Sequence, residues 1–358
     1  MERIRKNICP DLHGRARNFH LKKSAAIISG FHIHHLDHLL PLAEIIDIPV
    51  IVTDQDLFEI GKKCYPHVDL NYIPHAQFSP QHLATHFDAL FTSAKYWRLE
   101  LGGLIELLTG KKLDFLYCPH GNSDKGNYDV TLDPFRCQEN AIIYGDQMLN
   151  RLESWDVKLQ KVCAIGNYRL SYYLENKNRL DSLVKDELLI PKRKKTLFYA
   201  PSWDNSSLFH IEKQAICTIP NDIHLIVKLH PYLKEKHPST YSHFKSLCDD
   251  NEQITFIDNL PTIYPILDLC DGYIGDTSSI GYDFLFYDRP LFFIGDQSEA
   301  TPLFDTGIMV DGSLWESIDK HWDQSFLSKK RKELYTYAFG KMLPLDVIAK
   351  KVVNELLT

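Results

Sequence analysis

The sequence predicts an α/β protein built from two doubly wound, Rossmann-like domains that face each other across a cleft. From residue 24 onward, short apolar runs typical of buried strands alternate with segments of helical periodicity. This alternation is typical of parallel sheets with right-handed crossover connections. A charged stretch over residues 176–195 interrupts the alternation, which then restarts. Because 358 residues are enough for two medium domains, we place a domain boundary in this stretch.

The first half opens with a strand–helix–strand unit. Residues 25–29 form a short apolar run that ends at Gly30, and residues 49–52 form a second one. Between them, residues 36–46 carry apolar side chains at helical spacing, which predicts a crossover helix. Further strands, each ending at a proline or glycine, are predicted over residues 114–118, 141–145 and 162–166.

The second half repeats the pattern and ends in a helix. Strands are predicted over residues 196–200, 223–229, 272–275 and 290–294. Residues 345–357 carry apolar side chains at helical spacing. We therefore expect an N-terminal acceptor-side domain over residues 1–180, a C-terminal nucleotide-donor domain over 190–340, and a final helix within 341–358 that packs back on the N-terminal domain.

Composition and charge exclude several classes of protein. Hydrophobic residues make up 44% of the chain and charged residues 24%, which excludes a disordered chain. The net charge of −7 argues against a nucleic-acid partner bound through overall basic charge. The eight cysteines are scattered without a C-x-x-C pair, which indicates reduced thiols in a cytoplasmic protein. We see no apolar run approaching the ~20 residues of a membrane-spanning helix.

The N-terminal segment is basic. Residues 1–23 hold seven Lys or Arg residues against two acidic residues. One interpretation is a solvated tail. The other is a peripheral contact with an anionic membrane face, where each basic residue contributes about 1 kcal/mol.

The loop that begins at His120 is the first candidate site, because it follows a predicted strand. The carboxyl ends of parallel strands are where open α/β sheets bind ligands. His120 has an ordinary pKa near neutrality, which suits a general base, and Lys125 can bind phosphate. Asn122 and Asp124 of the same loop are candidates for the acceptor side. The alternative is a polar turn with an incidental histidine.

Two loops of the second half are candidates for a phosphate site. A predicted strand delivers Lys228 and His230 to the cleft, and Pro231 ends that strand. After residues 272–275 come Asp276, Thr277, Ser278 and Ser279, a small polar turn before an amphipathic segment. A serine at a helix start can cap the helix or hold an anion together with backbone N–H groups. Plain strand termination and plain capping are the alternatives.

Two further groups of residues lie at predicted strand ends. Ser202 and Trp203 follow residues 196–200, and Trp203 suits either a nucleotide base or a packing contact. Residues 32–38 concentrate histidines around an aspartate, and His32, His34 and His35 are acceptor-side candidates. A metal site is an alternative for this segment. Since no partner ligands at metal spacing stand out elsewhere, we expect no metal.

Five motifs, each after a predicted strand and in a fixed order, resemble the CDP-glycerol glycerophosphotransferase family from about residue 115 to the C-terminus. They are His120-Gly121 followed by Lys125, Gly166-Asn167-Tyr168-Arg169, Tyr199-Ala200-Pro201-Ser202-Trp203, Lys228 with His230-Pro231, and Asp276, Ser278, Ser279, Asp283 and Phe284 followed by Arg289-Pro290. The chain departs from the family at Asp204, where an arginine is common, and at Thr277, where a tyrosine is common.

The resemblance implies a GT-B architecture in which the C-terminal domain holds most of a nucleotide donor. It also implies catalysis without a metal or other cofactor, and it adds Arg169 and Asp283 to the donor-binding candidates. The enzymes of this family build or prime teichoic-acid-like polymers, so the expected acceptor is a lipid-linked or saccharide hydroxyl.

The function that these observations predict is transfer of a glycerol-phosphate-type group from a CDP-linked donor to that hydroxyl, with release of CMP. His120 would take the proton of the hydroxyl, and His230 with Ser278 and Ser279 would hold the diphosphate. Three alternatives remain: a GT-B glycosyltransferase that uses a sugar nucleotide, an inactive nucleotide-binding relative, and a sugar-nucleotide epimerase of similar fold.

Overall fold

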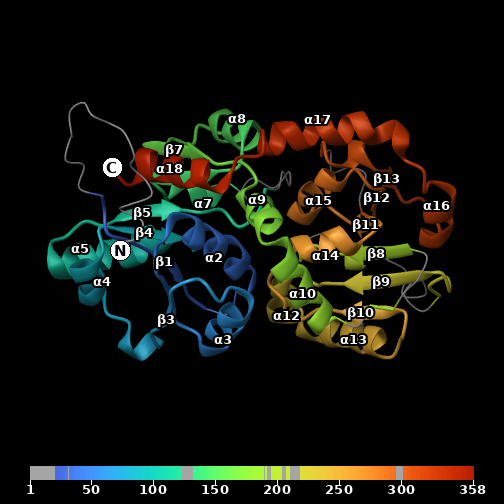
Figure 1. The fold of residues 1–358 in the computed structure, drawn as a ribbon, viewed down its shortest axis with the longest axis horizontal. Helices are drawn as coiled ribbons and strands as arrows, with labels where there is room; N and C mark the ends of the chain where they lie inside the picture. Colours follow the sequence, from blue (N-terminus) through green and yellow to red (C-terminus); the bar gives the residue numbers. More distant parts are fainter. Residues whose placement is uncertain are drawn as a thin grey trace.

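The computed structural model describes residues 21–30, 32–122, 132–188, 190–191, 195–203, 207–209, 218–295 and 301–358. Two wholly parallel sheets organise these residues (Figure 1). The first sheet has seven strands in the order β3-β2-β1-β4-β5-β6-β7, and the second has six in the order β10-β9-β8-β11-β12-β13. Helices cover both sheets, so the predicted α/β class with two doubly wound units is confirmed.

The first sheet contains the strands β1 (Ser24–Ile28), β2 (Val50–Val52), β3 (Leu70–Tyr72), β4 (Ala89–Thr92), β5 (Asp114–Tyr117), β6 (Asn140–Ile143) and β7 (Lys161–Ala164). The second contains β8 (Lys195–Tyr199), β9 (Ile223–Val227), β10 (Ile254–Phe256), β11 (Gly272–Gly275), β12 (Leu291–Phe293) and β13 (Ile308–Met309). We call the part built on the first sheet the N-terminal lobe and the part built on the second sheet the C-terminal lobe.

The helices of the N-terminal half are α2 (His34–Ile46), α3 (Gln55–Cys64), α4 (Pro80–His86), α5 (Gly103–Thr109), α7 (Asp133–Arg136), α8 (Asp146–Ser154), α9 (Tyr168–Glu175) and α10 (Lys177–Glu187). Those of the C-terminal half are α12 (Pro231–Lys236), α13 (Pro238–Asp249), α14 (Tyr264–Leu269), α15 (Ser279–Phe284), α16 (Leu314–Lys320), α17 (Ser328–Phe339) and α18 (Leu345–Leu356). Single helical turns are η1 (His75–Gln77), η2 (Arg98–Gly102), η3 (Ser207–Phe209), η4 (Leu285–Tyr287), η5 (Phe304–Thr306) and η6 (Ser325–Leu327).

The strands that the sequence predicted are those with long apolar runs. All five residues of β1 are buried, as expected for a strand covered by helices on both faces. Four strands were not predicted: β3, β4, β10 and β13. Three of them, β3, β10 and β13, are short and partly exposed, whereas β4 is buried throughout. Two residues of β3 are exposed, for example, so it lacks the apolar run that identified β1.

The charged stretch between the two sheets contains helix α10. Its residues Leu180 and Val184 are buried and stand four apart, so they share one face of the helix. This narrow apolar contact is sufficient to dock a helix that is otherwise charged. The first sheet ends at Ala164 in β7, and the second begins at Lys195 in β8.

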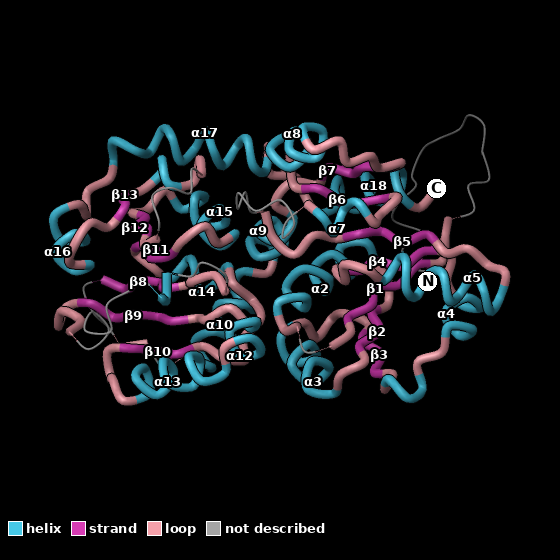
Figure 2. The backbone as a smooth tube through the Cα atoms, turned by 180° about the vertical axis from the view of Figure 1, so that it is seen from behind, coloured by secondary structure: helices cyan, strands magenta, loops and turns pink. Residues whose placement is uncertain are grey.

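The C-terminal helices return from the second lobe to the first. Helix α17 lies along the C-terminal lobe and reaches α8 of the N-terminal lobe, and α18 packs against β7, α2 and α9 (Figure 2). The two ends of the described chain meet there, since the Lys22 backbone N–H donates to the Leu357 carbonyl at 3.1 Å. Among the described residues, every helix is too short or too polar to cross a membrane.

Candidate functional site

Five histidines from three loops meet between the lobes, and we call them the imidazole cluster: His32, His34, His35, His120 and His230. The first three lie between β1 and the first turn of α2, and His120 follows β5. His230 follows β9 of the other sheet and is the N-cap of α12. The cluster therefore combines carboxyl-end loops of both sheets, where doubly wound folds bind their ligands.

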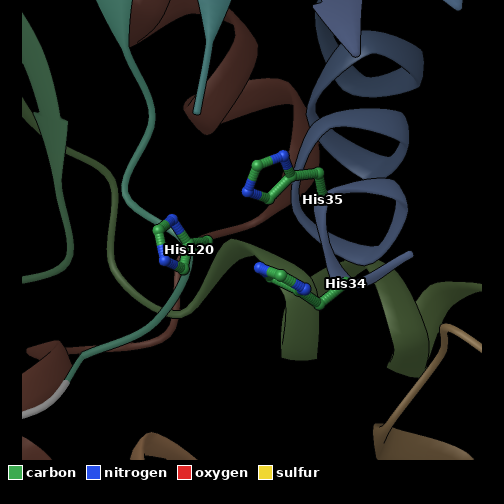
Figure 3. Close-up of side chains that lie close together, drawn as sticks. All are labelled: His34, His35 and His120. Atoms are coloured by element: carbon green, nitrogen blue, oxygen red, sulfur yellow. The ribbon is translucent and has the colours of Figure 1, made fainter. Parts of the chain in front are cut away.

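The rings of the imidazole cluster are close enough to contact one ligand. The centroid of the His34 ring lies 4.5 Å from that of His35, 5.2 Å from that of His120 and 5.6 Å from that of His230. The rings of His35 and His120 are 5.2 Å apart. Figure 3 shows His34 and His35 projecting from α2 toward His120 on its loop. His34 thus stands between the residues that the sequence proposed as base and phosphate ligand.

Desolvation lowers the pKa of the four cluster histidines of the N-terminal lobe, so these imidazoles stay neutral. It lowers the pKa of His34 and His35 well below the usual value of 6.5, and the neighbouring histidines lower it further. Desolvation, and then the charge of His32, lower the pKa of His120 to about 4. A neutral imidazole retains one unprotonated nitrogen, so His120 is in the state that accepts a proton at neutral pH.

His230 is held as a hydrogen-bond donor to the cleft. Its Nδ1 accepts a hydrogen bond from the backbone N–H of Tyr232 at 3.2 Å. A neutral imidazole that accepts at Nδ1 carries its proton on Nε2. We assign that tautomer from the hydrogen bond, and it gives His230 an N–H group for an anionic oxygen.

The His120 loop touches the serine turn of the opposite lobe. Gly121 has φ +133°, and a Cβ built there would lie 2.6 Å from the Ser279 Oγ. Glycine is needed here because φ is positive and because a Cβ would collide with the Ser279 Oγ. Ser278 caps α15, because its Oγ accepts from the Ile280 N–H at 3.4 Å, and it is buried together with Thr277. The structure therefore brings His120, His230 and the serine turn together where the two lobes meet.

Asp276 shapes the loop that follows β8. Its buried carboxylate accepts hydrogen bonds from the backbone N–H of Ser202, at 2.9 and 3.1 Å, and of Ser207, at 2.9 Å. The ring of Trp203 on this loop lies 5.5 Å from that of Tyr232, in an edge-on arrangement. The Tyr232 ring is in turn 5.1 Å from His32, so Trp203 and Tyr232 extend the cleft wall beyond the imidazoles.

Arg169 and Asp283 lie in a second polar group, which we call the bridging ion network. Arg169 donates to Asp37 of α2 at 2.8 Å and to Asp283 of α15 at 2.6 Å. Tyr65 donates to Asp37 at 2.8 Å, and Tyr264 donates to Asp283 at 2.6 Å. The arginine and both carboxylates are at most 5% exposed. The structure thus places these two donor-binding candidates in an ion network that joins the lobes.

Two more of the residues proposed from the sequence, Lys228 and Asn122, form hydrogen bonds within the protein. The Lys228 Nζ donates to the Leu260 carbonyl at 2.8 Å, and burial lowers its pKa to about 8. The buried Asn122 amide donates to the Gln147 Oε1 at 2.9 Å, and the Gln147 amide donates to the Tyr282 hydroxyl at 2.9 Å. Both side chains hold segments of the cleft in place.

Three residues singled out in the sequence lie outside the described residues: Asp124, Lys125 and Asp204. Two residues that matter to the site were missed by the sequence interpretation. Asp37 pairs with Arg169, and Tyr232 orients His230 and contacts Trp203. An acid embedded in a histidine-rich helix start was a signal for the first. An aromatic residue directly after His230-Pro231 was a signal for the second.

Residues 146–300 match the family model of the CDP-glycerol:poly(glycerophosphate) glycerophosphotransferases. The teichoic acid glycerol-phosphate primase of Bacillus spizizenii strain W23 is 26% identical over 219 residues, which cover 53% of this chain and 55% of the relative. The chain thus spans about half the length of this curated relative. The matched segment contains His230, the serine turn and the bridging Arg169, and the other four histidines of the imidazole cluster precede it.

Solved structures show the fold. The wall teichoic acid polymerase TagF, as a histidine variant soaked with CDPG, has a TM-score of 0.64 at 14% identity, over 93% of this chain and 89% of its own. MnaA of S. aureus with UDP has a TM-score of 0.60 at 13% identity, over 93% and 95%. UDP-GlcNAc 2-epimerase of Neisseria meningitidis with UDP-GlcNAc has a TM-score of 0.55 at 12% identity, over 92% and 100%.

These structures share the GT-B architecture of two Rossmann-like domains, which confirms the fold that the resemblance implied. The segment match and the curated relative also confirm the resemblance itself. Residues 146–300 of the chain are therefore similar to the CDP-glycerol:poly(glycerophosphate) glycerophosphotransferase family.

Proposed function

We propose that this protein transfers glycerol phosphate from CDP-glycerol to a hydroxyl acceptor in the synthesis of a teichoic-acid-type polymer, and releases CMP. The observation that carries the proposal is the convergence of His120, His230 and Ser279 on one cleft between two Rossmann-like lobes. The family match of residues 146–300 supports the choice of donor.

The reaction forms one P–O bond and breaks one. The acceptor oxygen attacks the phosphorus that carries glycerol, and the bond from that phosphorus to the bridging oxygen breaks. CMP leaves with the bridging oxygen, the product is a glycerol phosphodiester, and the hydroxyl proton passes to His120. A pKa of about 4 in the empty cleft keeps His120 neutral at neutral pH. The bound diphosphate is an adjacent negative charge, so it raises this pKa and makes the imidazole a stronger base.

The C-terminal lobe supplies hydrogen bonds to the phosphates. The Nε2–H of His230 donates to the diphosphate, and in the transition state it stabilises charge that develops on the bridging oxygen. The hydroxyl of Ser279 lies against Gly121, beside the base, and provides a second donor. Ser278 and Asp276 position these groups, by capping α15 and by holding the loop of Ser202 and Trp203.

Arg169 and Asp283 act as positioning residues in this proposal. The bridging ion network joins α2, α9 and α15, which are the elements that carry or adjoin the site. It therefore sets the spacing between the base on the N-terminal lobe and the donor site on the C-terminal lobe. The histidines of α2 that face His120, namely His34 and His35, lie on the acceptor side.

The acceptor in this proposal is a lipid-linked saccharide at the inner face of the membrane. Leu104, Leu107 and Leu108 of α5 are 43%, 81% and 50% exposed, which is unusual for three neighbouring leucines. Lys111 and Lys112 beyond the helix are paired with Asp88 and Glu139, so the exposed leucines carry the proposed membrane contact. We expect Leu107→Glu to reduce sedimentation with vesicles of anionic lipid, while Phe326→Glu, at a 68% exposed residue of the other lobe, leaves it unchanged.

The test of the function is a transfer assay followed by mass spectrometry. The protein is incubated with CDP-glycerol and a lipid-linked saccharide, and the expected products are CMP and an acceptor heavier by one or more glycerol phosphates. Thermal unfolding is measured in parallel with CDP-glycerol, CDP-ribitol, UDP-GlcNAc and a CMP-sugar, because a ligand stabilises the state that binds it. Stabilisation by UDP-GlcNAc with release of UDP and no transfer would contradict the proposal in favour of an epimerase. Transfer of a sugar would contradict it in favour of a glycosyltransferase, and binding of a donor without turnover would indicate an inactive relative.

A further inference from the structure

We propose that His34, His35 and His120 form a binding site for a divalent transition-metal ion, of which Zn²⁺ fits the ligand set best. The site was not expected from the sequence, because His120 stands 85 positions or more from the other two and only the fold brings it to them. The three ligand nitrogens, one from each ring, lie within 4.8 Å of one another. Figure 3 shows the three rings around a common space.

Small rotations of the side chains complete the coordination. Zinc binds histidine nitrogens at about 2.0–2.1 Å in a tetrahedron, which sets the nitrogens roughly 3.3 Å apart. Closing from 4.8 Å to this value requires a shift of about 1.5 Å, shared among three rings that each turn about two side-chain bonds. The backbone of α2 and the loop after β5 need not move.

The His34 ring has no hydrogen-bond partner among the described residues. Both of its ring nitrogens are buried, and neither has a hydrogen-bond partner within the described parts of the chain. A buried donor or acceptor left without a partner costs about 1–3 kcal/mol. Such a group in the wall of a cleft indicates a ligand that completes it. A metal ion satisfies one of the two nitrogens directly.

The chemistry of the three ligands selects the ion. Neutral imidazoles bind Zn²⁺, Cu²⁺ and Ni²⁺, whereas Mg²⁺ and Ca²⁺ require oxygen ligands. A metal displaces protons from its histidines, and burial already holds the pKa values of these three below the usual range. Three protein ligands leave a fourth position, toward His230 and the cleft, for water or a phosphate oxygen.

Metal binding and the proposed transfer use the same nitrogen lone pair of His120. If the proposed function holds, bound zinc prevents His120 from taking the acceptor proton, so zinc inhibits transfer and a chelator restores it. The metal site itself does not depend on the proposed function, since all three ligands belong to the N-terminal lobe and no donor is needed to assemble them.

The test is a calorimetric titration of the full chain with Zn²⁺ in the absence of donor and acceptor. We expect one ion per chain, and a loss of affinity of at least about 10–100-fold in His35→Ala and in His120→Asn, since even an outer-shell partner is worth that much. The matched control is the double variant His82→Ala, His86→Ala. In the wild-type protein these two histidines stand four positions apart on α4, with ring centroids 4.1 Å apart, and form the kind of surface pair that binds metals weakly.

Titration with Co²⁺ gives an independent readout, because tetrahedral cobalt absorbs strongly in the visible range. Far-ultraviolet circular dichroism tests whether each variant is folded. If His35→Ala does not fold, His120→Asn still tests the site, because it changes a loop residue and leaves α2 intact. Unchanged zinc affinity in the folded cluster variants, or loss of binding only in the His82 and His86 variant, would overturn the site. Stimulation of transfer by zinc would contradict the expected inhibition. Calorimetry would still decide separately whether the site binds zinc.

Discussion

Two polar groups join the lobes of this molecule, and they differ in whether their atoms have partners. In the bridging ion network, Arg169 pairs with two carboxylates, and each carboxylate accepts a further bond from a tyrosine. In the imidazole cluster, rings lie 4.5–5.6 Å apart, and the His34 nitrogens have no hydrogen-bond partner among the described residues. Each group joins segments that are more than 80 positions apart in the sequence, as Arg169 and its two carboxylates or His35 and His120 are.

The difference indicates which group binds ligands. A satisfied buried network is stable without a ligand, and replacing it by a substrate would leave buried charges unpaired. An unsatisfied cluster at the carboxyl ends of strands gains hydrogen bonds when a ligand enters. We therefore assign chemistry to the imidazole cluster and spacing of the lobes to the ion network, and the following variants test this division.

Replacing His120 by alanine should produce the largest change. A general base is worth about 10²–10⁴-fold in rate, so kcat for transfer should fall by that factor. The midpoint of thermal unfolding should change little, because among the described residues the His120 ring contacts the neighbouring imidazoles of His34 and His35 and makes no hydrogen bond. The matched control His86→Ala, on the surface of α4, should keep full activity. Near-normal turnover in folded His120→Ala would remove this residue from the mechanism.

Replacing Arg169 by methionine should have its main effect on stability. The substitution leaves Asp37 and Asp283 buried without their partner, which costs about 3–5 kcal/mol for a broken buried pair. Urea unfolding measures this loss. The control is Lys245→Met, which breaks the ion pair of Lys245 with Asp249 on the surface of α13 and should cost only about 0.3–0.5 kcal/mol. Equal losses in the two variants would contradict the assignment of the network to structure.

The stability of the protein should fall in mild acid. The unfolded chain protonates its histidines near pH 6.5, whereas the folded chain holds His120 neutral down to about pH 4 and also depresses the pKa values of His34 and His35. The unfolded state therefore binds more protons in this window, and the free energy of unfolding decreases as the pH falls from 6.5 toward 4. His34→Asn should flatten the dependence, as measured by urea unfolding at successive pH values. An unchanged slope would show that His34 is not held neutral.

Replacing Gly121 by alanine should give a modest loss of stability. A residue with a side chain in this sparsely populated positive-φ region costs about 1–3 kcal/mol. The added Cβ also meets the Ser279 Oγ, so the base and the serine turn separate and KM for the donor should rise. A KM that stays at the wild-type value would show that this contact lies outside the donor site.

The sequence predicted the fold and the loops of the site, because both follow from local patterns. Each strand that carries a cluster residue has an apolar run that ends at the histidine loop, as β5 does before His120 and β9 before His230. The partners of Arg169 were not predictable in this way. They lie 132 and 114 positions away along the chain, and no local pattern distinguishes an arginine that binds phosphate from one that pairs with two carboxylates.

The same limit explains the metal-ligand geometry. Residues 32–38 suggested a metal site by composition, but the third ligand, His120, comes from a strand that lies two positions from β1 in the sheet. Strand order, which the sequence pattern does not give, determines that β1 and β5 deliver their loops to one place. The tautomer of His230 likewise depends on a backbone N–H that the helix α12 presents.

The most direct test of the division between the two polar groups is a crystal structure of the protein with CDP-glycerol. The account predicts that the diphosphate lies within hydrogen-bond distance of His230 and Ser279, with the glycerol phosphorus facing His120, and that Arg169 keeps both of its carboxylate partners. A diphosphate bound by Arg169 in place of Asp37 or Asp283, or a donor bound away from the imidazole cluster, would contradict it.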